Sequence, residues 1–358
     1  MKKTGIRDVA KASGVSISTV SRAFTRPDLV SEKTRRKILK TADSLDFNIS
    51  RSATALKSGQ TYRVALLMNE EITSWFNTQV FAGIDSVMHK AGYDVDLFEH
   101  IDTAKNRSDF FTTLPVRCNV DAVFVASFAV DPHEAKRLRR IHVPIVGINT
   151  PTTANSDASI SIDDEQGMYV ATRHLIELGR HNLAYACSDP VTSINSSIDA
   201  RTTGFVRACR EAATTRDLDW RIVSVPRGKA FADSALEALL TLEDFPDGIC
   251  CQIDMMAIPL MIKLAGRGHT CPRDYSLVGF DDSPYADTVN LTTMRQDPYL
   301  MGMKAASKAL SLINGHAPDH AHETVTPELI LRGSDAPRET TDAIQTDARP
   351  TQANIITG

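Results

Sequence analysis

Short apolar runs rich in β-forming residues alternate with helical patterns along most of this chain, from residue 63 onward. The runs stand at residues 64–68, 95–98, 122–126, 145–148, 159–162, 183–187, 222–225, 248–251 and 276–280. Parallel strands cannot be joined by a tight turn and need a crossover, usually a helix. The alternation therefore predicts an α/β protein in which helices cover parallel sheets.

The alternation restarts at residue 159, which indicates two similar lobes. A late strand, a helix and another strand, at 292–295, 299–314 and 327–331, are expected to cross back between the lobes. We assign residues 62–162 and 292–325 to lobe 1, and residues 163–290 and 326–333 to lobe 2. Residues 334–358 are polar and lack a heptad pattern, so we expect a disordered tail.

The first 60 residues differ in charge from the rest of the chain. They hold thirteen Lys and Arg against five Asp and Glu, a net +8, whereas the remaining residues hold 27 against 39, a net −12. Three short helical patterns fall within residues 1–48, and residues 49–61 form a polar linker. A basic head on an acidic body indicates that the head meets a polyanion.

Composition excludes several classes of protein. With 42% hydrophobic and 23% charged residues, the 358-residue chain is expected to be globular with two or three domains. Its apolar runs are far shorter than the roughly 18 to 20 residues that span a bilayer, and no signal-peptide core follows the first residues. Six cysteines match neither a disulfide framework nor a zinc spacing. We expect a cytoplasmic protein with no membrane partner, metal or cofactor.

The segment DVAKASGVSISTVSR, from residue 8 to 22, carries the most specific signal. Gly14 can make a tight turn, Ser16 can cap the following helix, and Val20 can pack that helix on the first. The second helix then presents Arg22 outward, where its guanidinium can offer two donors to a guanine edge in the major groove. The segment predicts a helix-turn-helix DNA-binding domain.

Four ordered motifs resemble the lactose-repressor and galactose-repressor (LacI/GalR) family of bacterial transcription regulators. They are DVAKASGVSISTVSR, VSEKTRRKI at residues 30–38, HLIELGRHNLAY at 174–185, and SLVGFDDSPYADTVNLTTMRQ at 276–296. The resemblance implies a DNA-binding head at residues 1–48, a hinge at 49–61, and a core similar to periplasmic sugar-binding proteins. It also implies a homodimer that binds a near-palindromic operator DNA.

The resemblance places the recognition helix at residues 17–24. Ile17 and Ser18 stand where the family varies with operator sequence, and Arg22 is the general reader of bases. Because Ile17 is apolar, we expect it to contact a thymine methyl group or to read shape. Phosphate contacts are implied for Thr19, Ser21, Ser31 and Thr34.

The stretch SRSATALKSG, residues 50–59, resembles the family hinge, a short helix that folds when two protomers meet in the minor groove. Leu56 matches the leucine wedge, and Ala53 matches the close-contact position. An inserted leucine unstacks a base step and bends the duplex. Without the resemblance, Leu56 would be interpreted as a packing residue of an ordinary linker.

An effector is expected between the lobes, because open α/β sheets bind ligands outside the carboxyl ends of their strands. The resemblance assigns Arg201 as a guanidinium donor, Asp281 as an acceptor, Phe76 as a stacking aromatic, and Asn149 to the end of a strand. The local sequence also allows an ion pair at a helix start for Arg201, and a cap or turn for Asp281.

A second group of candidate effector residues marks departures from the family pattern. Trp75 replaces a common proline, Ile253 replaces a common asparagine, and Arg227 stands where an aromatic residue often occurs. Gln296 ends the last shared motif. An apolar Ile253 with an additional Arg227 is compatible with an unusual glycoside or an anionic ligand.

The sequence lacks the usual enzyme motifs: no GxGxxG follows the first strand, and there is no Walker loop, HExxH or Gly-x-Ser-x-Gly. We therefore predict no catalytic residues. The family resemblance implies a regulator, most simply a repressor of carbohydrate-use genes that a sugar-like effector releases. Control by a phosphorylated carrier protein as corepressor is the first alternative. A cytoplasmic sugar-binding module or enzyme is the second, and activation in place of repression stays open.

Overall fold

The computed structural model describes residues 4–25, 29–47, 60–99, 101, 108, 110–112, 120–140, 142–190, 196–228 and 230–338. The chain divides into two compact units, residues 1–63 with 119–121, and residues 64–118 with 122–358. No helix in the described part of the chain combines the length and apolarity that crossing a membrane requires.

The N-terminal head consists of three helices, α1 (Ile6–Ser13), α2 (Ile17–Thr25) and α3 (Glu32–Ser44). One residue from each helix, Val9, Val20 and Ile38, is fully buried in the small core that they share. Gly14 links α1 and α2 with φ at +67°, a conformation that glycine adopts without steric cost. The expected helix-turn-helix architecture is therefore present.

Lobe 1 is built on a six-stranded sheet of order β11-β5-β4-β3-β1-β2. Its strands are β1 (Arg63–Met68), β2 (Asp94–Phe98), β3 (Ala122–Ala126), β4 (Ile145–Ile148), β5 (Ala158–Ile162) and β11 (His322–Val325). Its helices are α5 (Trp75–Met88), α7 (Pro132–Arg139) and α13 (Pro298–Ile313). Strands β1, β3, β4, β5 and β11 pair in parallel, and β3 and β4 are wholly buried, as expected for a sheet covered on both faces.

Lobe 2 repeats this plan with a sheet of order β12-β10-β9-β8-β6-β7. Its strands are β6 (Asn182–Ser188), β7 (Asp219–Val225), β8 (Gly248–Cys251), β9 (Ser276–Asp281), β10 (Thr292–Arg295) and β12 (Glu328–Ile330). Its helices are α8 (Asp164–Glu177), α9 (Asp199–Ala212), α10 (Phe231–Leu240), α11 (Asp254–Ala265) and α12 (Pro284–Thr288). One apolar core lies beneath α8 and α9 and another beneath α10 and α11, so the predicted α/β lobes are confirmed.

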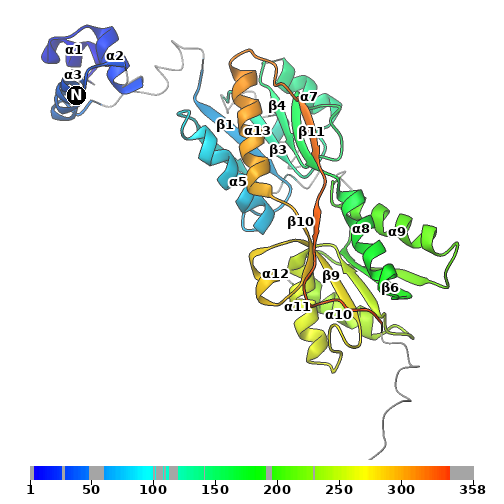
Figure 1. The fold of residues 1–358 in the computed structure, drawn as a ribbon. Coiled ribbons are helices and arrows are strands. Elements are labelled where there is room, and N and C mark those ends of the chain that lie inside the picture. The colour runs from blue at the N-terminus through cyan, green and yellow to red at the C-terminus, as the bar shows by residue number, and fades with distance from the viewer. Residues whose placement is uncertain are drawn as a thin grey trace, which may run out of the picture. The chain divides into compact units, whose positions relative to one another are not determined.

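The chain passes between the sheets three times, after β5, after β10 and after β11 (Figure 1). Our assignment of residues 292–325 to lobe 1 is wrong for its first element. Strand β10 pairs in parallel with β9 and antiparallel with β12, both in lobe 2. Only a short connection containing α12 separates β9 from β10, and it keeps β10 beside its predecessor.

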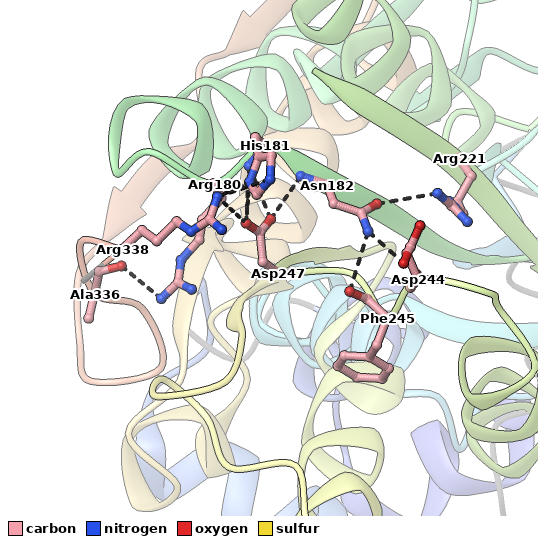
Figure 2. A network of polar contacts seen from close by, with 9 residues as sticks. All are labelled: Arg180, His181, Asn182, Arg221, Asp244, Phe245, Asp247, Ala336 and Arg338. Atoms are coloured by element: carbon pink, nitrogen blue, oxygen red, sulfur yellow. Dashed lines mark hydrogen bonds and ion pairs between the residues drawn. The ribbon is translucent and has the colours of Figure 1, made fainter. Parts of the chain in front are cut away.

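Residues 334–338 do not belong to the disordered tail that the sequence predicts. The Ser334 hydroxyl donates to the carbonyl of Leu277 (2.6 Å) and accepts from the backbone N–H of Thr292 (2.8 Å). Four residues on, the Arg338 guanidinium lies beside His181 and 3.6 Å from the Asp247 carboxylate (Figure 2). Residues 334–338 are thus bound to lobe 2, and residues 339–358 lie outside the described part of the chain.

Helices α5 and α13 pack with their backbones in contact. A Cβ atom on Gly83 of α5 would overlap the carbonyl oxygen of Tyr299, and one on Gly302 of α13 would overlap that of Val80. This contact joins α13, which follows the second passage between the lobes, to the first helix of lobe 1. The glycines are therefore required by space and not by backbone conformation.

Gly302→Ala is expected to lower the free energy of unfolding by about 1 to 3 kcal/mol, because the added methyl group forces the two helices apart. Thermal unfolding of the full chain measures the effect. Ser307→Ala, at an exposed position of the same helix, serves as control and should change little. Equal melting temperatures for the two variants would contradict the close packing.

Candidate DNA interface and effector cleft

Helix α2 turns the predicted DNA-reading side chains toward solvent. Val20 and Ala23 anchor the helix in the head's core, while Ser18 and Arg22 are exposed and 42% of Ile17 is exposed. An apolar side chain left this open can contact a base edge without rearrangement of the head. Thr19 and Ser21 are half-buried at the edge of the same face.

Hydroxyl groups organise the N-termini of α2 and α3. The Ser16 hydroxyl accepts the backbone N–H of Thr19 (3.1 Å), so it caps α2 as expected. Ser31 likewise accepts the N–H of Thr34 (3.4 Å), and their two hydroxyls are 2.8 Å apart. Exposed hydroxyls beside the positive end of a helix suit phosphate oxygens. The proposed wedge residue Leu56 and the close-contact residue Ala53 lie outside the described residues.

A cleft with a cavity of about 120 Å³ lies between the lobes, within the larger unit. It is lined by side chains that follow the carboxyl ends of strands in both sheets. All eight predicted effector residues line it: Trp75, Phe76, Asn149, Arg201, Arg227, Ile253, Asp281 and Gln296. The structure thus brings them around one cavity, and their role in binding stays a prediction.

Arg201 is the most constrained side chain of the cleft. It is 3% exposed, its Nε donates to Oδ1 of Asp164 (2.7 Å), and its Nη1 donates to the carbonyl of Gln252 (2.6 Å). Its guanidinium carbon lies 3.5 Å from the centre of the Phe280 ring. Arg201 therefore both forms an ion pair at a helix start and lines the cleft.

Asp164 joins the two lobes, and the sequence analysis missed it. Its Oδ1 accepts from Arg201 in lobe 2, while its Oδ2 accepts from the amide of Asn149 in lobe 1 (2.9 Å). By sequence, the acidic cluster of residues 163–165 could suggest a cation site, but at a helix start the helix dipole explains it more simply. In the structure only Asp163 caps α8, accepting from the N–H of Gln166 (2.9 Å).

Asp281 ends strand β9 and faces the cleft with 5% of its surface exposed. Its φ of +132° is a strained backbone conformation for a residue with a side chain. Burial raises the pKa of its carboxyl to about 8, while the Arg201 guanidinium 3.8 Å away acts in the opposite direction. The Gln296 amide donates to Asp281 Oδ1 (2.5 Å), and Gln296 Oε1 is buried without a partner among the described residues.

Ile253 and Asp254 lie on different sides of the cleft wall: the first in the cleft and the second in the interior of lobe 2. Ile253 lines the cavity, whereas Asp254 is fully buried and accepts from the N–H of Ser283 (2.8 Å) and the hydroxyl of Thr293 (2.7 Å). Burial raises the pKa of Asp254 to about 6. Ile253 thus places an apolar side chain in the cleft where the family pattern has an asparagine, while Asp254 holds groups inside lobe 2.

Because Asp281 holds its proton more tightly in the fold than the ordinary carboxyl does, its contribution to stability is present at low pH and is lost as pH rises through about 8. Asp281→Asn should therefore gain stability relative to the unaltered chain by up to about 1 kcal/mol for each pH unit between 5 and about 8, and the difference should level off above that. Thermal unfolding from pH 5 to 8.5 measures this difference. The exposed Asp319→Asn should show a flat difference, and the same flat line for Asp281→Asn would refute the assignment.

Two family models match parts of the two units. The one described as bacterial regulatory proteins, lacI family, matches residues 5–49, and the one described as a periplasmic binding protein-like domain matches residues 172–334. The HTH-type transcriptional repressor PurR of Vibrio vulnificus is 27% identical over 333 residues, 91% of this chain and 97% of that protein. PurR of Photobacterium profundum is 28% identical over 340 residues, 92% and 98% of the two chains.

Solved structures agree on the fold. The lac repressor dimer bound to operator and the anti-inducer ONPF has a TM-score of 0.76 at 22% identity, covering 94% of this chain and 100% of its own. A LacI family transcriptional regulator from Enterococcus faecalis with bound ribose has a TM-score of 0.66 at 25% identity, covering 77% and 100%. The head, the two-lobed core and these matches together indicate a LacI family transcriptional regulator.

Proposed function

We propose that this chain is a sequence-specific transcriptional repressor that a small, sugar-like effector releases from its operator. The observation that carries the proposal is the combination of an exposed reading helix in a basic head with a lobe-spanning cleft, lined by both polar and apolar side chains, in the same chain. The curated relatives are repressors by name, which favours repression over activation.

The cleft offers the groups that recognise a polyhydroxyl ring. Arg201 supplies N–H donors, Asp281 and Gln296 supply acceptors, and the aromatic rings of Trp75 and Phe76 supply flat apolar surfaces. The regulator from Enterococcus faecalis was solved with ribose, which supports a sugar. The same flat surfaces could also hold a purine base, so purines belong among the compounds to be tested.

A homodimer is the form in which we propose that the protein binds DNA. Helix α11 carries Ile262, which is 59% exposed, and Tyr285 on the adjoining α12 is 69% exposed. Exposed apolar side chains that gather on neighbouring helices favour a protein partner. A second copy of the chain would cover these apolar side chains and supply the second head that an inverted repeat requires.

Arg22→Ala is expected to reduce the preference for operator over random duplex by about 1 to 3 kcal/mol, because its side chain would read bases in the major groove. Fluorescence anisotropy on DNA from upstream of the protein's own gene measures this, and sedimentation of the complex counts the protomers on one duplex. Lys40→Ala, an exposed cation on α3, is the control for charge loss. An equal loss on operator and random DNA for Arg22→Ala would contradict base readout.

Sugars, sugar phosphates and purine bases should be tested for release of the purified protein from operator DNA. The compound that releases it is the effector. Asp281→Ala should keep operator binding and lose this response, because the carboxylate lies in the cleft and not in the head. An unchanged response would place the ligand elsewhere. If no compound acts on the purified protein but a phosphorylated carrier protein changes its operator affinity, the corepressor alternative replaces the small-molecule effector.

A further inference from the structure

An ion pair crosses the cleft from one lobe to the other. Glu70 follows strand β1 of lobe 1, Arg227 follows strand β7 of lobe 2, and both line the cavity. Arg227 Nη1 lies 3.2 Å from Glu70 Oε1. The two side chains therefore connect the lobes at the cavity itself, in a position where any closing or opening of the cleft must make or break their contact.

Arg227 is oriented by its own lobe. Its Nε donates to the backbone carbonyl of Asp189 at the end of β6 (2.8 Å), which leaves its Nη1 pointing to Glu70. A second carboxylate is also near: burial raises the pKa of Asp199, and the positive charge of Arg227 lowers it. The guanidinium is thus fixed at one end by a carbonyl and faces negative groups of both lobes.

Both arginines that line the cavity are already neutralised. Arg227 is paired with Glu70, and Arg201 is paired with Asp164. A negatively charged ligand would have to displace one of these carboxylates and would be repelled by it on the way in. The additional arginine, which by sequence was compatible with an anionic ligand, therefore offers no unmatched positive charge in this arrangement.

We propose that Glu70 and Arg227 form a clasp that holds the two lobes closed over the effector and bars negatively charged ligands. The proposal rests on the effector site proposed above. Two other links between the lobes are hydrogen bonds and not ion pairs. The Ser197 N–H donates to the carbonyl of Ser127 (3.3 Å), and the Asn149 amide donates to Oδ2 of Asp164 (2.9 Å). The clasp is therefore the ion pair among these links, and its strength depends on the charges of Glu70 and Arg227.

The clasp shifts the equilibrium between open and closed lobes but does not keep the lobes closed by itself. The Glu70 and Arg227 side chains are 52% and 29% exposed, so water and salt weaken their attraction. An exposed ion pair of this kind shifts an equilibrium by about two- to fivefold. Loss of this ion pair should leave the protein folded, so the clasp can be tested by substitution.

Charge reversal in the full chain tests closure. Dyes attached at exposed Lys90 in lobe 1 and Asp217 in lobe 2 report the open fraction by single-molecule energy transfer. Glu70→Arg and Arg227→Glu should each raise the open fraction by about two- to fivefold, and the double exchange should restore it.

The matched control is the ion pair of Arg267 with Glu237, which is also exposed but lies wholly within lobe 2. Arg267→Glu should leave the open fraction unchanged. Single clasp variants that behave like this control would overturn the proposal, as would a double exchange that is no more closed than the single variants.

Anion exclusion is tested with inorganic phosphate as the probe, by calorimetric titration. Glu70→Gln should bind phosphate at least fivefold more tightly than the unaltered chain, and adding Arg227→Gln should remove the gain. No gain in Glu70→Gln would refute the barrier to anions. Neither readout uses DNA or the natural effector, so failure of the clasp is distinct from failure of the regulator proposal, which operator binding decides separately.

Discussion

The buried carboxylate of Asp164 is the interaction on which the arrangement of the cleft depends. A buried charge is tolerated only when it is paired and hydrogen-bonded, and Asp164 meets that condition with partners from both lobes. Removing it would leave the Arg201 guanidinium buried without its closest anion. The position of Arg201, and with it one wall of the cavity, therefore follows from a residue that itself stands at the first passage between the lobes.

The same residues connect the cleft to that passage. Asn149 donates to Asp164 and accepts the backbone N–H of Ile162 (2.9 Å), the last residue of β5 before the chain leaves lobe 1. A ligand that engages Arg201 thus acts on a group already bonded to the connection between the lobes. Allosteric coupling requires a ligand to favour one of two arrangements, and this hydrogen-bonded series is a physical element through which an effector could do so.

Local sequence patterns predicted the helices and strands of this protein better than they predicted which segments those helices and strands contact. The alternation of β-rich runs and helices predicted both lobes, and Gly14 and Ser16 predicted the turn and cap of the head. Of the eight candidate effector residues that meet at one cavity, five end a strand or follow one closely, whereas Trp75, Phe76 and Arg201 lie in the first turns of helices α5 and α9. Strand β10 was misplaced because strand pairing depends on distant segments, whereas periodicity reports only local conformation. Asp164 was missed for a related reason: its local explanation at a helix start was sufficient, and its partners are 15 and 37 positions away.

Charge also constrains how a signal could pass from the cleft to DNA. The basic head and the acidic body give the molecule a strongly asymmetric field that favours DNA contact through the head alone. In the cleft, by contrast, Arg201 and Arg227 are matched by carboxylates, and an uncharged effector would leave that balance intact. Ions in solution also screen exposed charges beyond about 8 Å at physiological salt. Under the proposed function, release from the operator therefore follows from a change in how the two lobes meet and not from a change in the field at the DNA.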